Sequence, residues 1–241
     1  MTEQPVQYLL TSAVGHPFPE FVRDLIAQRS ARSVCDMGGG ANPILSLEEI
    51  ASMGLRYVLA DVSTTELAKA PPGYETRTLA MSGSSIDFGG EPFDLVISRF
   101  VVEHIADPAS FHTAVRDALI PGGFAAHFFP TLPSPPFVLN RILGHRARRL
   151  VDLLQPGRRN EDGRHGKFRP YYRWCEGPTR RQYRRFDSIG FGIEQYIVLV
   201  GHAYHARFSA LHHAATAVSH ALVRLRVPAV ATYAILVLRR R

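Results

Sequence analysis

Strand-like and helix-like segments alternate along the first 130 residues of the chain, and this alternation limits the possible folds more than any other feature. Short apolar segments suited to buried strands are separated by segments with apolar residues at helical spacing. Such alternation predicts parallel strands in one sheet with helices on both faces. Ligands of these sheets bind beyond the carboxyl ends of the strands, so we expect a functional site at that edge. The predicted strands are "SVCDM", "RYVLAD", "FDLVIS" and "FAAHFFPT", with a weaker candidate in "YETRTLAM".

The first of these strands runs directly into a glycine-rich segment, "DMGGGANP", from Asp36 to Pro43. Because glycine has no side chain, such a loop lets the backbone approach a ligand closely. A dinucleotide-binding loop would have a third glycine where Pro43 stands, and a P-loop would end in Gly-Lys-Ser or Gly-Lys-Thr, which is missing here. Both phosphate-binding interpretations are therefore weakened. A simple tight turn is the structural alternative.

A second feature favours a different ligand. Asp61 ends the second predicted strand, 25 residues after Asp36. A carboxylate at this position can accept hydrogen bonds from both hydroxyls of a ribose, which serves any adenosyl cofactor and not only dinucleotides.

Four segments then carry a resemblance to a known family. The segments "VCDMGGGANP", "YVLADVS", "FDLVISRFVVEHIADP" and "LIPGGF" resemble, in order and spacing, the motifs of class I S-adenosylmethionine-dependent methyltransferases, in particular the ubiquinone-biosynthesis-like (type 11) members. The resemblance covers about residues 30 to 130. It implies S-adenosylmethionine as the cofactor. It also implies an α/β fold with a Rossmann-like seven-stranded sheet, helices on both faces and an antiparallel last strand.

The resemblance also implies a set of cofactor-binding residues. The family's first motif is matched by Asp36, Gly38 and Gly40, with Asn42 at the position of its third glycine. Asp61 matches the ribose-binding acid, and Val62 follows it beside the adenine. The family often has an acid after the third strand, where this chain has "MSGSSID". The expected set is Asp36, Met37, Gly38, Gly39, Gly40, Asn42, Asp61, Val62, Ser84, Ser85 and Arg99.

His104 is the candidate catalytic residue. It follows the fourth predicted strand within "SRFVVEHIADP", and the pair Glu103-His104 is typical of the ubiquinone-biosynthesis-like members. An oxygen nucleophile needs a proton acceptor, and histidine suits this task near neutral pH. In the alternative interpretation, Glu103 and His104 stabilise the loop against the cofactor pocket.

We expect a single domain over residues 1–241, with a basic insertion at about 132–178 and a helical insertion at about 203–227. Between Arg141 and Arg185 there are fourteen Arg or Lys residues against four Asp or Glu, and aromatic residues interleave in "RPYYRWC". This pattern suits nucleic acid, anionic sugars, phospholipid headgroups or a carboxylate-bearing acceptor. A solvated, arginine-rich surface is the alternative.

The segment "YHARFSALHHAATAVSHALVRL" is predicted to be an apolar helix with basic ends. It can pack on the sheet, form a dimer contact or lie on an anionic membrane. Its His213 and His220 share one face, but no carboxylate or cysteine joins them, so we predict no metal site. The chain has an early acid and no basic start typical of a signal peptide, which predicts a cytoplasmic protein, with contact at the inner membrane face as an option.

The resemblance thus implies methyl transfer from S-adenosylmethionine, with O-methylation of a small molecule, a glycan or a lipid intermediate as the favoured reaction. One alternative is an RNA methyltransferase that uses the basic insertion. Another is a cofactor-binding partner protein without catalysis. The oligomeric state is not predicted.

Overall fold

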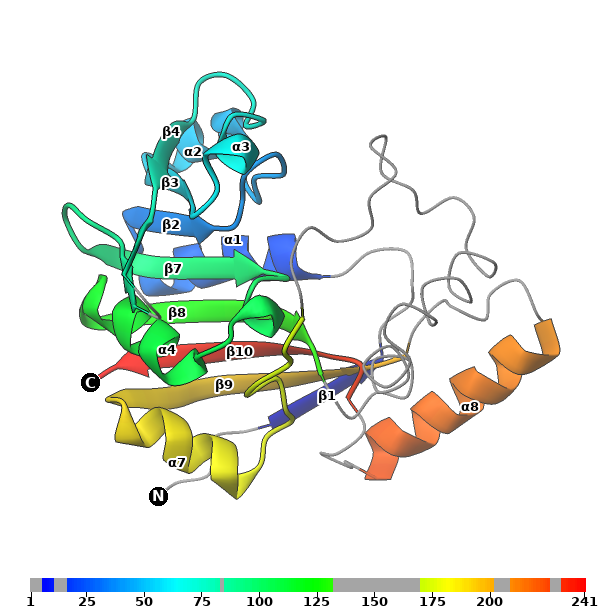
Figure 1. The fold of residues 1–241 in the computed structure, drawn as a ribbon. Helices are drawn as coiled ribbons and strands as arrows, with labels where there is room; N and C mark the ends of the chain where they lie inside the picture. Colours follow the sequence, from blue (N-terminus) through cyan, green and yellow to red (C-terminus); the bar gives the residue numbers. More distant parts are fainter. Residues whose placement is uncertain (1–5, 11–16, 83–84, 132–169, 202–208, 226–230) are drawn as a thin grey trace.

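The alternating segments form one mixed sheet of eight strands in a computed structural model of the chain (Figure 1). The structure describes residues 6–10, 17–82, 85–131, 170–201, 209–225 and 231–241. The strand order is β1-β9-β10-β8-β7-β2-β3-β4, and β5 and β6 form a separate hairpin. The strands are β1 (Val6–Leu10), β2 (Ser33–Met37), β3 (Arg56–Asp61), β4 (Glu75–Thr78), β5 (Ala80–Ser82), β6 (Ser85–Asp87), β7 (Phe93–Arg99), β8 (Leu119–Pro130), β9 (Phe191–Val200) and β10 (Tyr233–Arg240).

Helices cover both faces of the sheet, as predicted (Figure 1). On one face, α1 packs through Phe18 and Val22 against strand residues such as Leu95. On the other face, the buried side chains of Phe111 in α4 and Phe186 in α7 join a second apolar cluster. The described helices are α1 (Phe18–Arg29), α2 (Leu47–Met53), α3 (Thr64–Leu67), the 3₁₀ helix η1 (Val102–His104), α4 (Pro108–Asp117), α7 (Arg180–Ser188) and α8 (Ser209–Leu225).

The prediction of seven strands was wrong, because β1 adds an eighth at one edge. This strand pairs in parallel with β9 along its whole length, from Val6 opposite Tyr196 to Leu10 opposite Val200. The pattern of β1 hides it in the sequence, since Leu9 and Leu10 are exposed and the alternation of apolar and polar residues is lost. The predicted antiparallel last strand is confirmed, because β10 runs antiparallel to both β8 and β9.

Local signals set the ends of two helices near the sheet. Ser46 and Glu49 form a capping box at the start of α2, and Gly54 ends that helix with φ of +61°. Asp107 caps α4 by accepting a hydrogen bond from Ser110 N at 3.2 Å. Strand β8 begins at Leu119, shortly after α4 ends, so the segment Pro121-Gly122-Gly123 lies within the strand.

Both predicted insertions are described only in part. Residues 132–169 of the basic insertion lie outside the described residues, whereas 170–178 are described. Helix α8 occupies most of the predicted helical insertion at 203–227. Among the described residues, no helix is both long enough and apolar enough to cross a bilayer. The division of the chain into one domain with two insertions stays a prediction.

Candidate functional site

The site is built at the edge of the sheet where β2, β3, β7 and β8 end. These four strands run in parallel, so their carboxyl ends meet at this edge. The glycine-rich loop follows β2, Asp61 ends β3, and the loop with Phe100 and His104 follows β7. The predicted cofactor and catalytic residues of these three segments are therefore brought to one edge.

The glycine-rich loop is tightly fixed by its neighbours. Gly38 N donates a hydrogen bond to Ala60 O at 2.7 Å, and Asn42 N closes the turn onto Gly39 O at 2.7 Å. Gly38 has φ of +74°, and a Cβ added to it would lie 2.4 Å from Val101 Cγ2. A Cβ on Gly40 would lie 3.2 Å from the carbonyl oxygen of Glu66. Gly38 is thus required by its backbone conformation and by space, whereas a side chain at Gly40, with φ of +24°, would need Glu66 to shift.

Asp36 lies beneath this loop rather than on its surface. Its side chain is 1% exposed, and Oδ2 accepts hydrogen bonds from Tyr57 OH at 2.6 Å and from Ile44 N at 2.9 Å. Burial raises the pKa of Asp36 to about 6, although these two hydrogen bonds oppose the rise. Asp36 therefore ties the chain just after the loop to β3. Its direct contact with a cofactor stays a prediction.

Asp61 offers a half-buried carboxylate next to the glycine loop. Its Oδ1 accepts a hydrogen bond from Ser63 N at 2.8 Å, which fixes the side chain at the end of β3. Burial raises the pKa of Asp61, and the amide of Ser63 opposes this shift. The next residue, Val62, is exposed. The preceding residue, Ala60, is the one that binds Gly38 through its carbonyl oxygen, so the acid and the loop are neighbours.

The remaining predicted cofactor residues differ in their placement. Arg99 donates a hydrogen bond to Asn42 O at 3.0 Å, which joins the end of β7 to the glycine loop. The side chain of Met37 is buried in the core, so only its backbone can face the loop. Ser84 lies outside the described residues. Ser85 begins β6 in the separate hairpin.

Glu103 and His104 lie in η1, close to the same loop. His104 N donates to Val101 O at 2.9 Å, and Val101 is the residue that packs against Gly38. The His104 side chain is partly exposed, and its Nε2 lies 4.0 Å from Glu103 Oε1. This geometry suits a side chain that meets an acceptor, and it equally suits a loop-stabilising pair.

The end of the basic insertion is hydrogen-bonded to η1 at Glu103, whose side chain is buried. The carbonyl oxygen of Glu103 accepts hydrogen bonds from Tyr171 N at 2.7 Å and Tyr172 N at 3.0 Å. The side chain is 5% exposed, and within the described residues its Oε2 has no hydrogen-bond partner. Burial raises the pKa of Glu103 to about 8.

A buried histidine pair lies under the same segment. His127 Nδ1 and Ser98 Oγ are 2.8 Å apart, and the ring of His112 lies 5.1 Å from that of His127. His112 also stacks on Trp174 at 6.0 Å between ring centroids. Burial lowers the pKa of both histidines, that of His127 to about 3, so both are neutral at pH 7. His127 is thus a buried core histidine of β8.

Sequence reasoning missed Tyr57, which holds Asp36 in place. Tyr57 directly precedes the aliphatic residues "VLA" of the predicted strand "RYVLAD". A tyrosine there is a usable signal of a polar contact in the core, because a buried phenol needs a hydrogen-bond partner. The sequence also carries no signal for the left-handed backbone of Phe100, which has φ of +58°, because glycine, asparagine and aspartate are the usual residues in that conformation.

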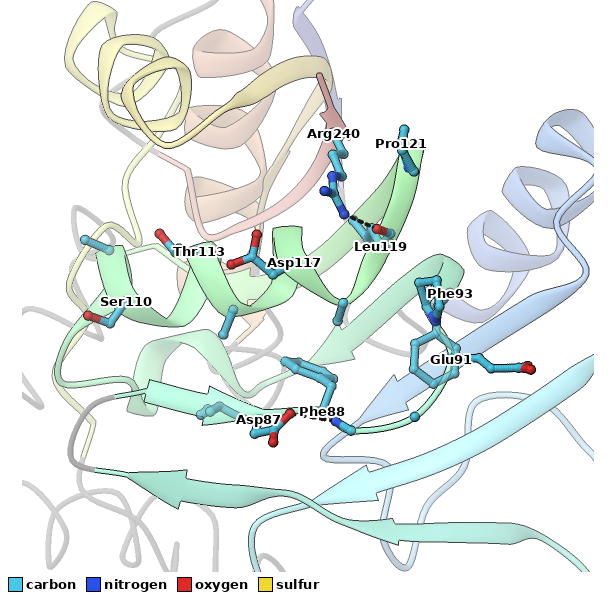
Figure 2. Close-up of a pocket in the computed structure, with 17 residues that line it drawn as sticks. Asp87, Phe88, Glu91, Phe93, Ser110, Thr113, Asp117, Leu119, Pro121 and Arg240 are labelled. Carbon is cyan, nitrogen blue, oxygen red and sulfur yellow. Dashed lines mark hydrogen bonds between the residues drawn. The ribbon is translucent and has the colours of Figure 1, made fainter.

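A cavity of about 850 Å³ lies elsewhere, at the opposite edge of the sheet (Figure 2). Its lining comes from the segment before β7, from α4, and from the start of β8, with Arg240 at the end of β10. Figure 2 shows Asp87, Phe88 and Phe93 on one side of it and Thr113 and Asp117 on the other. Among the described residues, none of those predicted to bind the cofactor lines this cavity, which lies where β7 and β8 begin, away from the site at the carboxyl ends.

The pH dependence of the free energy of unfolding tests whether the Glu103 carboxyl is buried. Its folded pKa lies above its usual value of 4.5, so between about pH 4.5 and 8 the unfolded state holds fewer protons at this group than the folded state. We therefore expect the free energy of unfolding to fall as pH rises through this range, by up to about 1.4 kcal/mol per pH unit. Glu103→Gln should remove this part of the slope in urea unfolding measured at pH 5, 6, 7 and 8.

Glu91→Gln is the matched control, because Glu91 is exposed and should leave the slope unchanged. If the slope of Glu103→Gln equals that of the unmodified chain, the Glu103 carboxyl is ionised at little cost and is not buried in solution.

Comparison with known proteins agrees with the predicted family. Residues 35–127 match a family model described as a methyltransferase domain. The ubiquinone biosynthesis O-methyltransferase of Ruegeria pomeroyi is 35% identical over 111 residues, which cover 43% of this chain and 44% of that protein. Its counterpart in Cereibacter sphaeroides is 33% identical over 109 residues with the same coverage. The chain thus matches less than half the length of these curated relatives.

Solved structures show the same fold over nearly the whole chain. An S-adenosylmethionine-dependent methyltransferase from Clostridium acetobutylicum aligns with a TM-score of 0.54 at 12% identity, covering 92% of this chain and 90% of that one. The [4+2]-cyclase SpnF aligns with a TM-score of 0.51 at 15% identity, covering 92% and 80%. Since a cyclase and a methyltransferase share this fold, the likeness establishes the fold and leaves the reaction to the site.

Proposed function

We propose, on the premise that residues 35–127 belong to the methyltransferase-domain family, that the chain transfers a methyl group from S-adenosylmethionine to an oxygen of a small-molecule acceptor. The observation that carries this proposal is the convergence of the glycine-rich loop, Asp61 and the loop after β7 at one edge of the sheet. The relatives that match in sequence are named as O-methyltransferases, which favours oxygen as the methylated atom.

The residues present fit such a cofactor. Gly38 to Gly40 place no side chain between the ends of β2 and β3, so backbone amides and carbonyls of the loop can face a ligand. Asp61 offers a carboxylate that is already oriented by Ser63 N, and its second oxygen can accept from the ribose hydroxyls. When bound, S-adenosylmethionine supplies an electrophilic methyl group, so the protein supplies position and electrostatics.

Asp36, Arg99 and Val101 act on this site through the backbone of the loop. Asp36 fixes the chain after the loop, and Arg99 binds the carbonyl oxygen of Asn42. Val101 closes the space beside Gly38. These contacts hold the loop before a cofactor arrives, which lowers the entropy cost of binding.

His104 is proposed as the proton acceptor for the acceptor hydroxyl. It is partly exposed, it follows β7 at the same edge, and imidazole accepts a proton near neutral pH. The His104 nitrogen near the Glu103 carboxyl is Nε2. A protonated His104 would therefore form an ion pair with Glu103 once Glu103 is ionised.

A basic surface near the site supports a broad class of acceptors, those that carry negative charge. Arg180, Arg181 and Arg184 are exposed on α7, beside the described end of the basic insertion. This surface suits an anionic acceptor, either a small molecule with phosphate or carboxylate groups, a glycan or lipid intermediate of that kind, or RNA. Contact of α8 with a membrane stays a prediction, with Val218 and Leu225 as its exposed apolar residues.

Methyl-labelled S-adenosylmethionine tests the proposal when it is offered with a hydroxyl acceptor, the matching amine and total RNA. We expect label on the hydroxyl acceptor, and a loss in turnover on the order of 100-fold or more for His104→Ala with cofactor affinity kept. His220→Ala is the control, since His220 is exposed on α8. Label on RNA alone would favour the RNA methyltransferase, and cofactor binding without any transfer would favour a non-catalytic partner. Equal loss of turnover and affinity in His104→Ala would assign His104 to loop stability.

A further inference from the structure

Phe100 adopts a backbone conformation that its side chain disfavours. It follows β7 directly and has φ of +58°, in the left-handed region. In this region Cβ crowds the following carbonyl oxygen, so residues other than glycine, asparagine and aspartate are uncommon there. Such strain persists where the surrounding structure fixes it, and it concentrates at functional sites.

The two neighbours of Phe100 both contact the glycine-rich loop. Arg99 donates to Asn42 O at 3.0 Å, and Val101 packs against Gly38. Phe100 N donates to Phe128 O at 2.9 Å, which fixes the backbone to β8. The strained residue is therefore held at the rim of the loop by three contacts that do not involve its own ring.

The ring of Phe100 stands on an aromatic support. It meets Phe128 edge-on at 5.0 Å between centroids and Tyr233 edge-on at 6.1 Å. Phe128 and Tyr233 stack on each other at 5.5 Å, and Phe128 also stacks on Phe18 at 5.5 Å. The support holds the ring in place, yet 40% of Phe100 is exposed.

Core packing accounts poorly for a ring in this position. Burial is the main gain from a large apolar side chain, and Phe100 forgoes much of it while carrying backbone strain. Phe128 is already fully buried between Phe18 and Tyr233. The 40% of Phe100 that is exposed beside the cofactor loop is accessible to a ligand that packs on the ring.

We propose that Phe100 is a specificity-determining residue of the acceptor site, where its exposed face packs against a flat or apolar part of the acceptor. This inference rests on the proposed function, because the acceptor must lie beside the cofactor loop. Aromatic rings favour offset and edge contacts with flat partners, so the residue selects a planar group near the oxygen that is methylated.

Phe100→Gly and Phe100→Asn separate this role from packing, because both residues tolerate the left-handed backbone and both remove the ring. We expect the melting temperature of each variant to stay equal or rise, and the affinity for S-adenosylhomocysteine to stay unchanged. The probe is 2-naphthol, a planar hydroxyl compound, titrated by calorimetry with S-adenosylhomocysteine present. Its affinity should fall on the order of tenfold in both variants, whereas Leu225→Ala, exposed on α8, should keep it.

Three results would overturn the inference. The first is an unmodified chain that binds S-adenosylhomocysteine but not 2-naphthol. The second is equal binding of 2-naphthol by both variants and the unmodified chain. The third is a lower melting temperature in both variants, which would make the ring a packing residue. Failure of the proposed function is distinguishable, because it would show as the absence of S-adenosylhomocysteine binding in the unmodified chain itself.

Discussion

Asp61→Asn is expected to weaken the binding of S-adenosylmethionine by about 100-fold, as measured by calorimetry. Asparagine has the shape of aspartate, and its single oxygen can keep the hydrogen bond from Ser63 N. It loses the charge and the second acceptor oxygen, which we assign to the ribose hydroxyls. Hydrogen bonds to a charged group contribute about 1.5–3 kcal/mol each, and 1.4 kcal/mol is about tenfold in affinity.

Two further variants make this result specific. Asp61→Ala also removes the bond from Ser63 N and should abolish binding. Asp24→Asn removes an exposed carboxylate on α1 and should change nothing. Unchanged affinity in Asp61→Asn, with an unchanged melting temperature, would remove Asp61 from the cofactor site and with it the main support for an adenosyl ligand.

The fold was largely predictable because its signals are local. Apolar strands such as Phe93–Arg99 and capped helices such as Pro108–Asp117 are set by the residues within them and at their ends. The edge strand Val6–Leu10 was not predictable, because it pairs with β9, which lies much later in the chain, from Val6 opposite Tyr196 to Leu10 opposite Val200. Its exposed leucines also erase the alternation that would have shown it.

The candidate site was predictable as a list of residues but not as a structure. The glycine pattern located the loop, yet nothing in it shows that Asp36 lies underneath and is bound by Tyr57. The carbonyl oxygen of Glu103 is bound by the amides of Tyr171 and Tyr172, which are far along the chain. The strained backbone of Phe100 depends on contacts with two separate segments, the glycine-rich loop and β8.

Gly38→Ala is expected to destabilise the fold by about 2–4 kcal/mol and to abolish binding of S-adenosylmethionine. Two effects add here. With φ of +74°, any side chain at Gly38 is strained, and the new Cβ would lie 2.4 Å from Val101 Cγ2. The loop must then move away from the loop after β7, which separates the segments that we assign to the cofactor and to the acceptor. Urea unfolding and calorimetry measure the two losses.

Two variants separate strain from collision at this position. Gly89→Ala has nearly the same backbone problem, with φ of +58°, but nothing lies within 4 Å of its added Cβ, so it should cost only about 1–2 kcal/mol. Adding Val101→Ala to Gly38→Ala removes the collision and should recover part of the stability. If Gly38→Ala costs no more than Gly89→Ala and still binds the cofactor, contact with Val101 does not constrain the loop. In that case the loop would tolerate a side chain at the place that we assign to the ligand. The glycines would then be needed only for a tight turn.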